Sequence, residues 1–311
     1  MNGARYAYLN RICELVEQGN PIIIVSEDYA APMFDSFRVK YPKHFLSVGI
    51  AEQNGVAVAC GLALAGKYPI VYGCAPFPLT RAFDQVKSAV AMMHLPMTIL
   101  NSGIGFGVPE FGATHYNVDD ISIVRGIPGL RIVTPSDNIM ATRLADFSIH
   151  SKETLYVRFD KNSEGTCYPP EAVNFRRGFY MVQKTGECAS AVVVSCGFMF
   201  QEIMQIAEKL KPEGIGLKLI DLYSLPFDET AFLTELGDLP VLTIEEHVLQ
   251  GGIGSAVLEL LNKHQACNRI VRHGIDFGDC YPTISGSRNY FMKEYSLSPQ
   301  HIEQIIREIC S

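Results

Sequence analysis

The chain has 311 residues, of which 48% are hydrophobic and 19% are charged, and its formal net charge is −7. These values are typical of a soluble globular protein with large apolar cores, and the length suits one large domain or two ordinary ones. The negative charge, with no block rich in lysine and arginine, argues against nucleic acid or an anionic membrane as a partner.

The nine cysteines are scattered along the chain, are odd in number and form no C-x-x-C pair. This usage is typical of reduced thiols in the cytosol. The first thirty residues lack a basic segment followed by a long apolar core, and the apolar run 21–25 is too short to cross a membrane. We therefore expect a cytoplasmic protein.

In the first half of the chain, short apolar runs alternate with helical patterns. Apolar residues at helical spacing predict a helix over 7–17, which Gly19 and Pro21 end before a short buried strand at 22–25. Because such strands read as continuous apolar runs, a parallel sheet covered on both faces is expected. Further strands are expected at 45–48, 69–72, 97–100, 130–133 and 154–159, and helices at 51–65, 80–94 and 136–150, the last with Ser136 as its N-cap.

The segment 161–174 is rich in proline, glycine, serine and charge, which favours a linker. The alternation of strands and helices resumes after it. Strands are expected at 191–195, 217–222, 241–244 and 270–273, and helices at 198–210 and 254–264 and after Ser298-Pro299. The predicted fold class is α/β, with two doubly wound domains over residues 1–170 and 171–311.

One carboxylate is out of place in this pattern. Glu52 follows the apolar run 45–48 and stands at the head of the segment 51–65, which is almost wholly small and apolar. Such surroundings disfavour a charged group unless a partner compensates for its lost hydration. From the residues alone, Glu52 is either a carboxylate that caps a buried helix or a proton-handling group aimed at a ligand.

Other motifs are weaker. The glycine-rich turns at 103–107 and 251–254 do not complete G-x-G-x-x-G and are not followed by Lys-Ser/Thr, which argues against dinucleotide and P-loop sites. No H-E-x-x-H or paired-cysteine spacing occurs, so no metal site is expected on this chain. His115 lies in a glycine-rich loop after a buried strand, where α/β sheets place ligands, although a histidine bonded to the loop backbone is the alternative.

Five segments occur in the order found in transketolases and 1-deoxyxylulose-5-phosphate synthases. The chain thus resembles the pyrimidine-binding and C-terminal domains of that thiamine-diphosphate family over nearly its whole length. It is most similar to the smaller subunit of split transketolases, in which the diphosphate-binding domain is a separate polypeptide. The segments are SVGIAEQNGVAVACGLALAG, VYGCAPFPLTRAFDQV, GFGVPEFGATHYNVDDISIVRGIPGLRIVTPSD, TLYVRF and TIEEHVLQGGIGSAV.

The resemblance implies roles for four residues. In the family, the glutamate that matches Glu52 hydrogen-bonds N1′ of the cofactor's aminopyrimidine and favours the tautomer that removes the thiazolium proton. Phe77 looks like the aromatic residue that stacks on this ring, with Phe83 as the alternative. Asp28 matches an acidic position near the cofactor, or else caps a strand end. His115 matches the histidine that polarises the carbonyl group of the substrate.

The resemblance also implies substrate contacts. Arg158 falls on the arginine that binds a sugar phosphate, with a salt bridge near the domain boundary as the alternative, and Arg5 is a second phosphate candidate. Phe111 stands where the family has an aspartate that recognises a substrate hydroxyl, which makes Glu110 a candidate substitute. Met33 replaces a phosphate-binding serine. These departures leave it open whether the substrate is phosphorylated.

The family holds the diphosphate through Mg²⁺ on a G-D-G motif with an asparagine further on, and this sequence contains no Gly-Asp-Gly. The resemblance therefore implies a larger partner subunit that carries the motif, in an α2β2 assembly in which this chain also dimerises. The implied reaction moves a two-carbon ketol unit from a ketose to an aldehyde. The alternatives are a pyruvate-using 1-deoxyketose synthase-type enzyme, the β subunit of a 2-oxo-acid dehydrogenase and a noncatalytic regulatory homologue.

Overall fold

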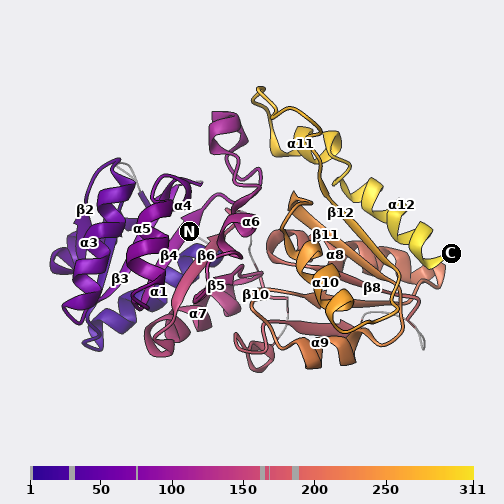
Figure 1. Ribbon diagram of the computed structural model, residues 1–311, viewed down its shortest axis with the longest axis horizontal. Helices are drawn as coiled ribbons and strands as arrows, with labels where there is room; N and C mark the ends of the chain where they lie inside the picture. Colours follow the sequence, from indigo (N-terminus) through magenta and orange to yellow (C-terminus); the bar gives the residue numbers. More distant parts are fainter. Residues whose placement is uncertain (1–2, 28–31, 75, 162–164, 168, 184–188) are drawn as a thin grey trace.

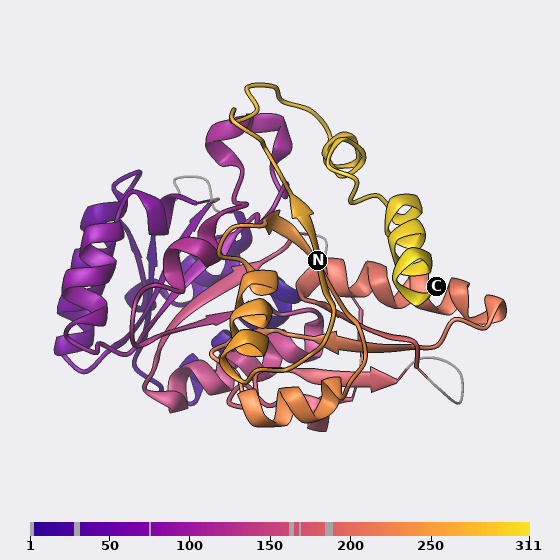
Figure 2. The same cartoon turned by 45° about the vertical axis from the view of Figure 1, so that its right-hand side comes forward.

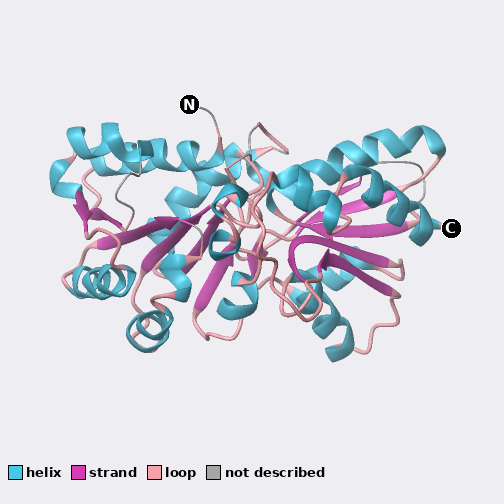
Figure 3. Ribbon diagram, turned by 90° about the horizontal axis from the view of Figure 1, so that it is seen from above, coloured by secondary structure: helices cyan, strands magenta, loops and turns pink. Residues whose placement is uncertain are grey.

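Two β-sheets with helices on both faces lie side by side, the first built from the N-terminal half of the chain and the second from the C-terminal half (Figure 1, Figure 3). The computed structural model describes residues 3–27, 32–74, 76–161, 165–167, 169–183 and 189–311. This arrangement confirms the predicted α/β class with two doubly wound domains. The boundary at residue 170 stays a prediction.

The first sheet has seven strands in the order β10-β5-β6-β4-β3-β1-β2. All pair in parallel except β10, which the second half of the chain contributes antiparallel to β5. The central strands β4 and β6 are buried at every position, as expected for parallel strands that helices cover on both faces. The strands are β1 (Ile22–Ser26), β2 (Phe45–Ser47), β3 (Tyr68–Cys74), β4 (Met97–Ser102), β5 (Leu130–Val133), β6 (Thr154–Phe159) and β10 (Ser224–Leu225).

The second sheet has five strands in the order β12-β11-β8-β9-β7, and its edge strand β7 runs antiparallel to β9. Helix α12 packs against α8 on one face of this sheet, and the two helices cross at a large angle in Figure 2. The strands are β7 (Tyr180–Gln183), β8 (Ala191–Ser195), β9 (Leu217–Asp221), β11 (Val241–Val248) and β12 (Ile270–Ile275).

The helices connect the strands in the predicted alternation, and short ones follow several strand ends. Within the described ranges, no helix combines the length and apolar content needed to cross a bilayer. The α-helices are α1 (Ala4–Glu17), α2 (Asp35–Lys40), α3 (Glu52–Leu64), α4 (Phe77–Thr80), α5 (Phe83–Gln85), α6 (Asp120–Val124), α7 (Asn138–Ser151), α8 (Gly197–Leu210), α9 (Glu229–Leu236), α10 (Ile253–Lys263), α11 (Arg288–Glu294) and α12 (Pro299–Cys310).

Two local predictions were wrong. The helix expected over 80–94 is divided into α4, α5 and a π-helical segment, η3 (Val86–Ala91), so its turns are not uniform. The N-cap of α7 is Asp137, whose carboxylate accepts a 2.7 Å hydrogen bond from Met140 N. Ser136 Oγ instead accepts a 2.8 Å bond from Gly197 N of the second domain, so it is engaged across the domain junction.

Candidate active site

Glu52 is the first residue of α3 and is 6% exposed. Its Oε1 accepts a 2.9 Å hydrogen bond from Nη1 of Arg81, so the buried carboxylate has a cation as partner. This contact supplies the compensation that the apolar surroundings of Glu52 require. Its geometry is that of an ion pair rather than of a helix cap.

Arg81 connects Glu52 to the second predicted cofactor residue. Its Cζ lies 4.1 Å from the ring centroid of Phe77, within the range of a cation–π contact. Phe77 begins α4, directly after β3, so it stands at the carboxyl end of a central strand. The side chain of Arg81 is 49% exposed. Sequence reasoning assigned no role to Arg81, and its place in the RAFDQ run was the available signal.

His115 joins the same group from a separate loop. The centroids of its ring and of the Phe77 ring lie 5.0 Å apart at 82°, and the centroids of its ring and of the Phe111 ring lie 5.1 Å apart at 36°. Burial lowers the pKa of His115, and the positive charge of Arg81 lowers it further, while the charge of Glu110 opposes this shift. Burial and the charge of Arg81 thus favour the neutral form of the His115 imidazole.

The second domain holds the loop that carries His115. Phe106 N donates a 2.7 Å hydrogen bond to Glu246 Oε1, and the Phe106 ring stacks on Phe291 of α11 at 4.6 Å and 13°. Gly105 has φ of +59°, and a β-carbon there would lie 2.6 Å from Glu246, so glycine is required for this approach. Tyr116 Oη donates to the carbonyl oxygen of Ile284. The loop and α11 lie close together in both views (Figure 1, Figure 2).

A second carboxyl group lies near Glu52. Glu27 follows β1 directly, is 3% exposed, and neither of its carboxyl oxygens has a hydrogen-bond partner within the described part of the chain. Burial, and then the charge of Glu52, raise the pKa of Glu27 to about 9. Sequence reasoning did not single out Glu27. An acidic residue immediately after a buried strand was the signal that marked it.

Arg158 is enclosed at the domain junction and is 3% exposed. Its Nε and Nη2 donate to the two carboxylate oxygens of Asp120 at 2.8 and 2.9 Å, and its Nη1 donates to Thr134 Oγ1 at 3.0 Å. Asp120 also accepts a bond from Tyr156 Oη. These contacts match the salt-bridge alternative, because each donating nitrogen of Arg158 already has a protein acceptor. The phosphate role of Arg158 stays a prediction.

The remaining predicted residues lie in different surroundings. Arg5 Nη1 donates a 3.3 Å bond to Ser102 Oγ at the carboxyl end of β4. Met33 is buried in the apolar core, whereas Phe83 is 37% exposed. Asp28 lies outside the described residues.

The glycine-rich turn before α10 has a structural explanation. Glu245 accepts hydrogen bonds from Ile253 N and Gly254 N at 2.8 and 2.9 Å, so a carboxylate of the chain itself occupies this helix N-terminus. A β-carbon on Gly252 would lie 2.0 Å from Glu245 Oε2. The turn therefore accommodates Glu245, and the weak dinucleotide interpretation gains no support.

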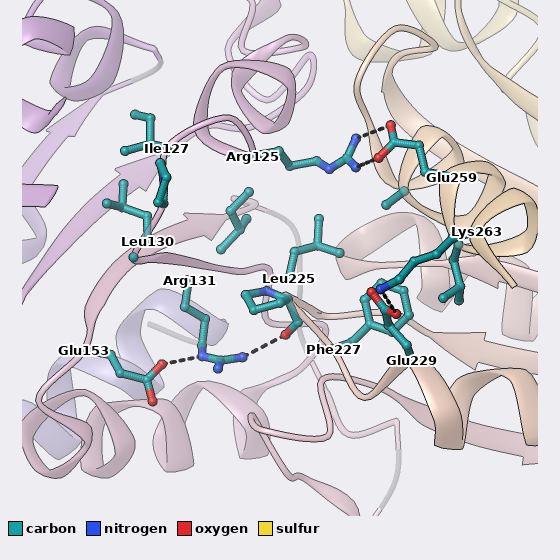
Figure 4. Close-up of a pocket in the computed structure, with 16 residues that line it drawn as sticks. Arg125, Ile127, Leu130, Arg131, Glu153, Leu225, Phe227, Glu229, Glu259 and Lys263 are labelled. Carbon is teal, nitrogen blue, oxygen red and sulfur yellow. Dashed lines mark hydrogen bonds and ion pairs between the residues drawn. The ribbon is translucent and has the colours of Figure 1, made fainter.

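A cavity of about 640 Å³ lies between the domains, away from this group (Figure 4). None of Glu52, Phe77, Arg81 and His115 lines it. The three cations among its lining residues are each paired with a carboxylate, in Arg125–Glu259, Arg131–Glu153 and Lys263–Glu229, at 2.6 Å in every case. The described residues of its walls therefore offer no unpaired positive charge to an anionic ligand.

Comparison with known proteins identifies the family. Residues 3–165 match the domain family described as transketolase, pyrimidine binding domain, and residues 182–302 match transketolase, C-terminal domain. A subunit of the apulose-4-phosphate transketolase of Actinobacillus succinogenes is 29% identical over 299 residues, which cover 94% of both chains. The 1-deoxy-D-xylulose-5-phosphate synthase 2 of Geobacter sulfurreducens is 33% identical over 279 residues, which cover 88% of this chain and 44% of the synthase.

A solved structure supports the same conclusion. A chain described as split gene transketolase, inactive beta4 tetramer, superposes with a TM-score of 0.85 at 25% identity, covering 100% of this chain and 99% of that chain. Both domain families match in the order in which the two sheets follow each other along the chain. This chain therefore belongs to the transketolase family.

Proposed function

We propose that this chain is the small subunit of a two-subunit, thiamine-diphosphate-dependent enzyme that transfers a two-carbon ketol unit from a ketose to an aldehyde. The observation that carries this proposal is the grouping of Glu52, Phe77 and His115, from three separate segments, around Arg81. A carboxyl group beside an aromatic ring suits an aminopyrimidine, which is flat and hydrogen-bonds through its ring nitrogens.

Each residue of the group has a proposed task. When bound, thiamine diphosphate supplies the nucleophilic carbon that allows the bond next to a ketose carbonyl to break. Glu52 would hold the pyrimidine through a hydrogen bond and exchange a proton with it, and Phe77 would supply a flat apolar surface for the ring. His115, whose pKa is lowered by burial, would donate a hydrogen bond from its neutral ring to the carbonyl oxygen of the substrate.

Arg81 has to move when the pyrimidine binds, because it contacts both groups that the ring requires. Its side chain is half exposed, so the guanidinium can move into solvent, and the buried carboxylate of Glu52 then bonds to the pyrimidine instead. We therefore propose that Arg81 leaves Glu52 and the Phe77 ring before the cofactor is seated.

The diphosphate end of the cofactor is assigned to a larger partner subunit, since the sequence has no Gly-Asp-Gly for the Mg²⁺ that accompanies it. Exposed apolar side chains around α3 and η3 support association with other subunits: Ile50 is 73%, Leu64 65% and Met92 71% exposed. The Actinobacillus relative is named as one subunit of a transketolase, and the similar solved chain is described as an inactive tetramer. An α2β2 assembly, with this chain also contacting its own copy, fits these observations.

We propose sugar substrates, with Glu110 and Arg5 as further contacts beside His115. The charge of Glu110 acts on His115, and Arg5 reaches the carboxyl end of β4. Phe111, 61% exposed next to His115, takes the place of the aspartate that the resemblance predicts there. An apolar ring at this position favours a substrate with fewer hydroxyl contacts than the usual sugar phosphates make.

Reconstitution tests the proposal. The chain is mixed with a candidate larger subunit that carries G-D-G and the later asparagine, thiamine diphosphate and Mg²⁺, and ketose consumption is followed with an aldehyde acceptor. Ketol transfer that requires both chains is the expected result. Decarboxylation of pyruvate would point to a synthase, and reduction of a lipoyl acceptor would point to a 2-oxo-acid dehydrogenase. If calorimetry of the mixture detects no cofactor binding, the catalytic proposal is wrong and a regulatory homologue replaces it.

A further inference from the structure

Glu27 is the buried ionisable group of the site that the proposed mechanism leaves unused. Its carboxyl group packs between two glycines: a β-carbon on Gly55 would lie 2.3 Å from its Oε1, and one on Gly73 would lie 3.2 Å from its Oε2. Pro78 also packs against Gly73. Glu27 therefore fills a space that opens only because α3 and β3 lack side chains there.

This packing puts Glu27 against the face of α3 that carries Glu52. Gly55 follows Glu52 by three residues in α3, and residues three apart in a helix are neighbours on one face. The two carboxyl groups are therefore close enough for the charge of Glu52 to act on Glu27, at the carboxyl end of the sheet, where β1 and β3 both end.

The two carboxyl groups differ in the partners that surround them. Glu52 has the guanidinium of Arg81, whereas both oxygens of Glu27 are buried without a hydrogen-bond partner in the described part of the chain. Among described residues, Glu52 on α3 is the charged group that acts on Glu27, and the neighbouring positions of β3 and α4, Gly73 and Pro78, do not ionise. A buried carboxylate with no partner is costly, so Glu27 takes up a proton instead.

We propose that Glu27 is a positioning residue of the cofactor site: it stays an uncharged carboxylic acid beside Glu52 and so keeps Glu52 in the place that the aminopyrimidine needs. An ionised Glu27 would repel a carboxylate at position 52 and so displace it. The inference rests on the proposed function for its role, but the uncharged state of Glu27 is tested without any cofactor.

The first test follows the unfolding of the full chain alone, as wild type and as Glu27→Gln, between pH 5 and pH 9. Folding raises the pKa of Glu27 from 4.5 to about 9, so between these values the native state holds a proton that the unfolded state has lost. The stability of the wild type therefore falls as pH rises, and glutamine, which has no such proton, removes this loss.

We expect the melting temperature of Glu27→Gln to exceed that of the wild type by an amount that grows with pH and reaches the order of 5 °C at pH 8. Glu171→Gln, at an exposed position, is the matched control and should keep the pH dependence of the wild type. A difference between Glu27→Gln and wild type that does not change with pH would show that Glu27 is ionised in the folded chain, and would overturn the inference.

The second test measures the dissociation constant of thiamine diphosphate for the reconstituted complex across the same pH range. In the wild type, affinity should fall about tenfold as pH rises through 9. Glu27→Gln should bind with a flat profile, and Glu27→Ala should bind more weakly at every pH because it leaves a hole beside Glu52. Identical pH profiles for wild type and Glu27→Gln would refute the positioning role. If Glu52→Gln in the same complex also changes nothing, the proposed function fails instead.

Discussion

Two arginine–carboxylate pairs in the first domain share the same chemistry and differ in their surroundings. Arg81 holds Glu52 at 2.9 Å with half of its own side chain in solvent, whereas the side chains of Arg158 and Asp120 are 4% and 0% exposed. Burial opposes ionisation of Asp120, but the charge of Arg158 and its hydrogen bonds outweigh it and lower the pKa of Asp120. The sealed pair is thus a fixed cross-link, and the open pair is one that a ligand can replace.

The largest expected effect breaks the sealed pair. Asp120→Ala leaves the guanidinium of Arg158 buried without its counter-ion, which should lower the free energy of unfolding by about 3–5 kcal/mol. Denaturant titration of the isolated chain measures this loss. The double variant Asp120→Ala/Arg158→Met should recover part of the loss, because it removes the uncompensated charge. A loss below about 1 kcal/mol in the single variant would show that the junction admits water.

Changes in the open pair should lower the turnover number and leave the folding stability nearly unchanged. In the reconstituted complex, Glu52→Gln is expected to lower kcat by about 100-fold or more, since it removes a group that exchanges a proton with the cofactor. The melting temperature of the isolated chain should stay within a few degrees of the wild type. Full activity in Glu52→Gln would exclude this role for Glu52.

His247 lies beside Asp120 of the sealed pair, and its protonation can be followed through the pH dependence of stability. His247 Nδ1 donates a 2.7 Å bond to the carbonyl oxygen of Val248, and its Nε2 accepts a bond from Ile121 N, so the ring is neutral. Burial lowers the pKa of His247 to about 4 from its usual 6.5. Between pH 6.5 and pH 4, the unfolded state therefore binds a proton that the native state does not bind. The free energy of unfolding should fall by up to about 3 kcal/mol as the pH drops through this range.

The control for this titration is His247→Gln, which should reduce the slope of unfolding free energy against pH in that window, whatever its effect at neutral pH. An unchanged slope would mean that other groups cause the acid sensitivity.

A smaller effect, on cofactor affinity, is expected from Phe77, whose ring contacts Arg81 of the open pair. Phe77→Ala should weaken the binding of thiamine diphosphate to the complex by about tenfold, which corresponds to about 1.4 kcal/mol of lost stacking. Phe77→Tyr keeps the ring and should bind nearly as the wild type does. Isothermal titration of both variants distinguishes stacking from mere packing, because equal affinities for alanine and tyrosine would rule out stacking.

The smallest effect should come from the cation of the open pair. Arg81→Gln is expected to change the free energy of unfolding by less than Asp120→Ala does, because the Arg81 side chain is half in solvent and glutamine can still donate a hydrogen bond to the Glu52 carboxylate. It should also leave cofactor affinity unchanged or raise it, since no guanidinium has to leave Glu52. A fall in affinity of more than tenfold would show that Arg81 holds the cofactor instead of yielding to it.

Much of the fold could be predicted because its determinants are local. The buried strands β5, β6 and β8 have the predicted bounds, since continuous apolar runs between turns specify buried parallel strands. The short edge strand β10 was missed, because a two-residue strand leaves no pattern and forms only where β5 has a free edge. The interruption of the helix predicted over 80–94 also depends on how that segment packs.

In the candidate site, too, some features could be predicted from local motifs and others depend on contacts between distant segments. The sequence pointed to Glu52, Phe77 and His115 through their motifs, and the structure brings the three together. The pairing of Arg81 and the enclosure of Arg158 were not predictable, because a charged residue looks the same in a sequence whether its partner comes from solvent, a ligand or a distant segment.

By itself, the sequence determined the order of strands and helices, the α/β class and the odd carboxylate at the head of an apolar helix, since periodicity and composition are properties of neighbouring residues. Only the tertiary structure decided which carboxylates have cations, that the Glu27 oxygens are left without a partner among the described residues, and that α11 holds the loop of His115. Burial and charge compensation arise from contacts between segments that lie far apart in the chain, and these contacts separate the open ion pair from the sealed one.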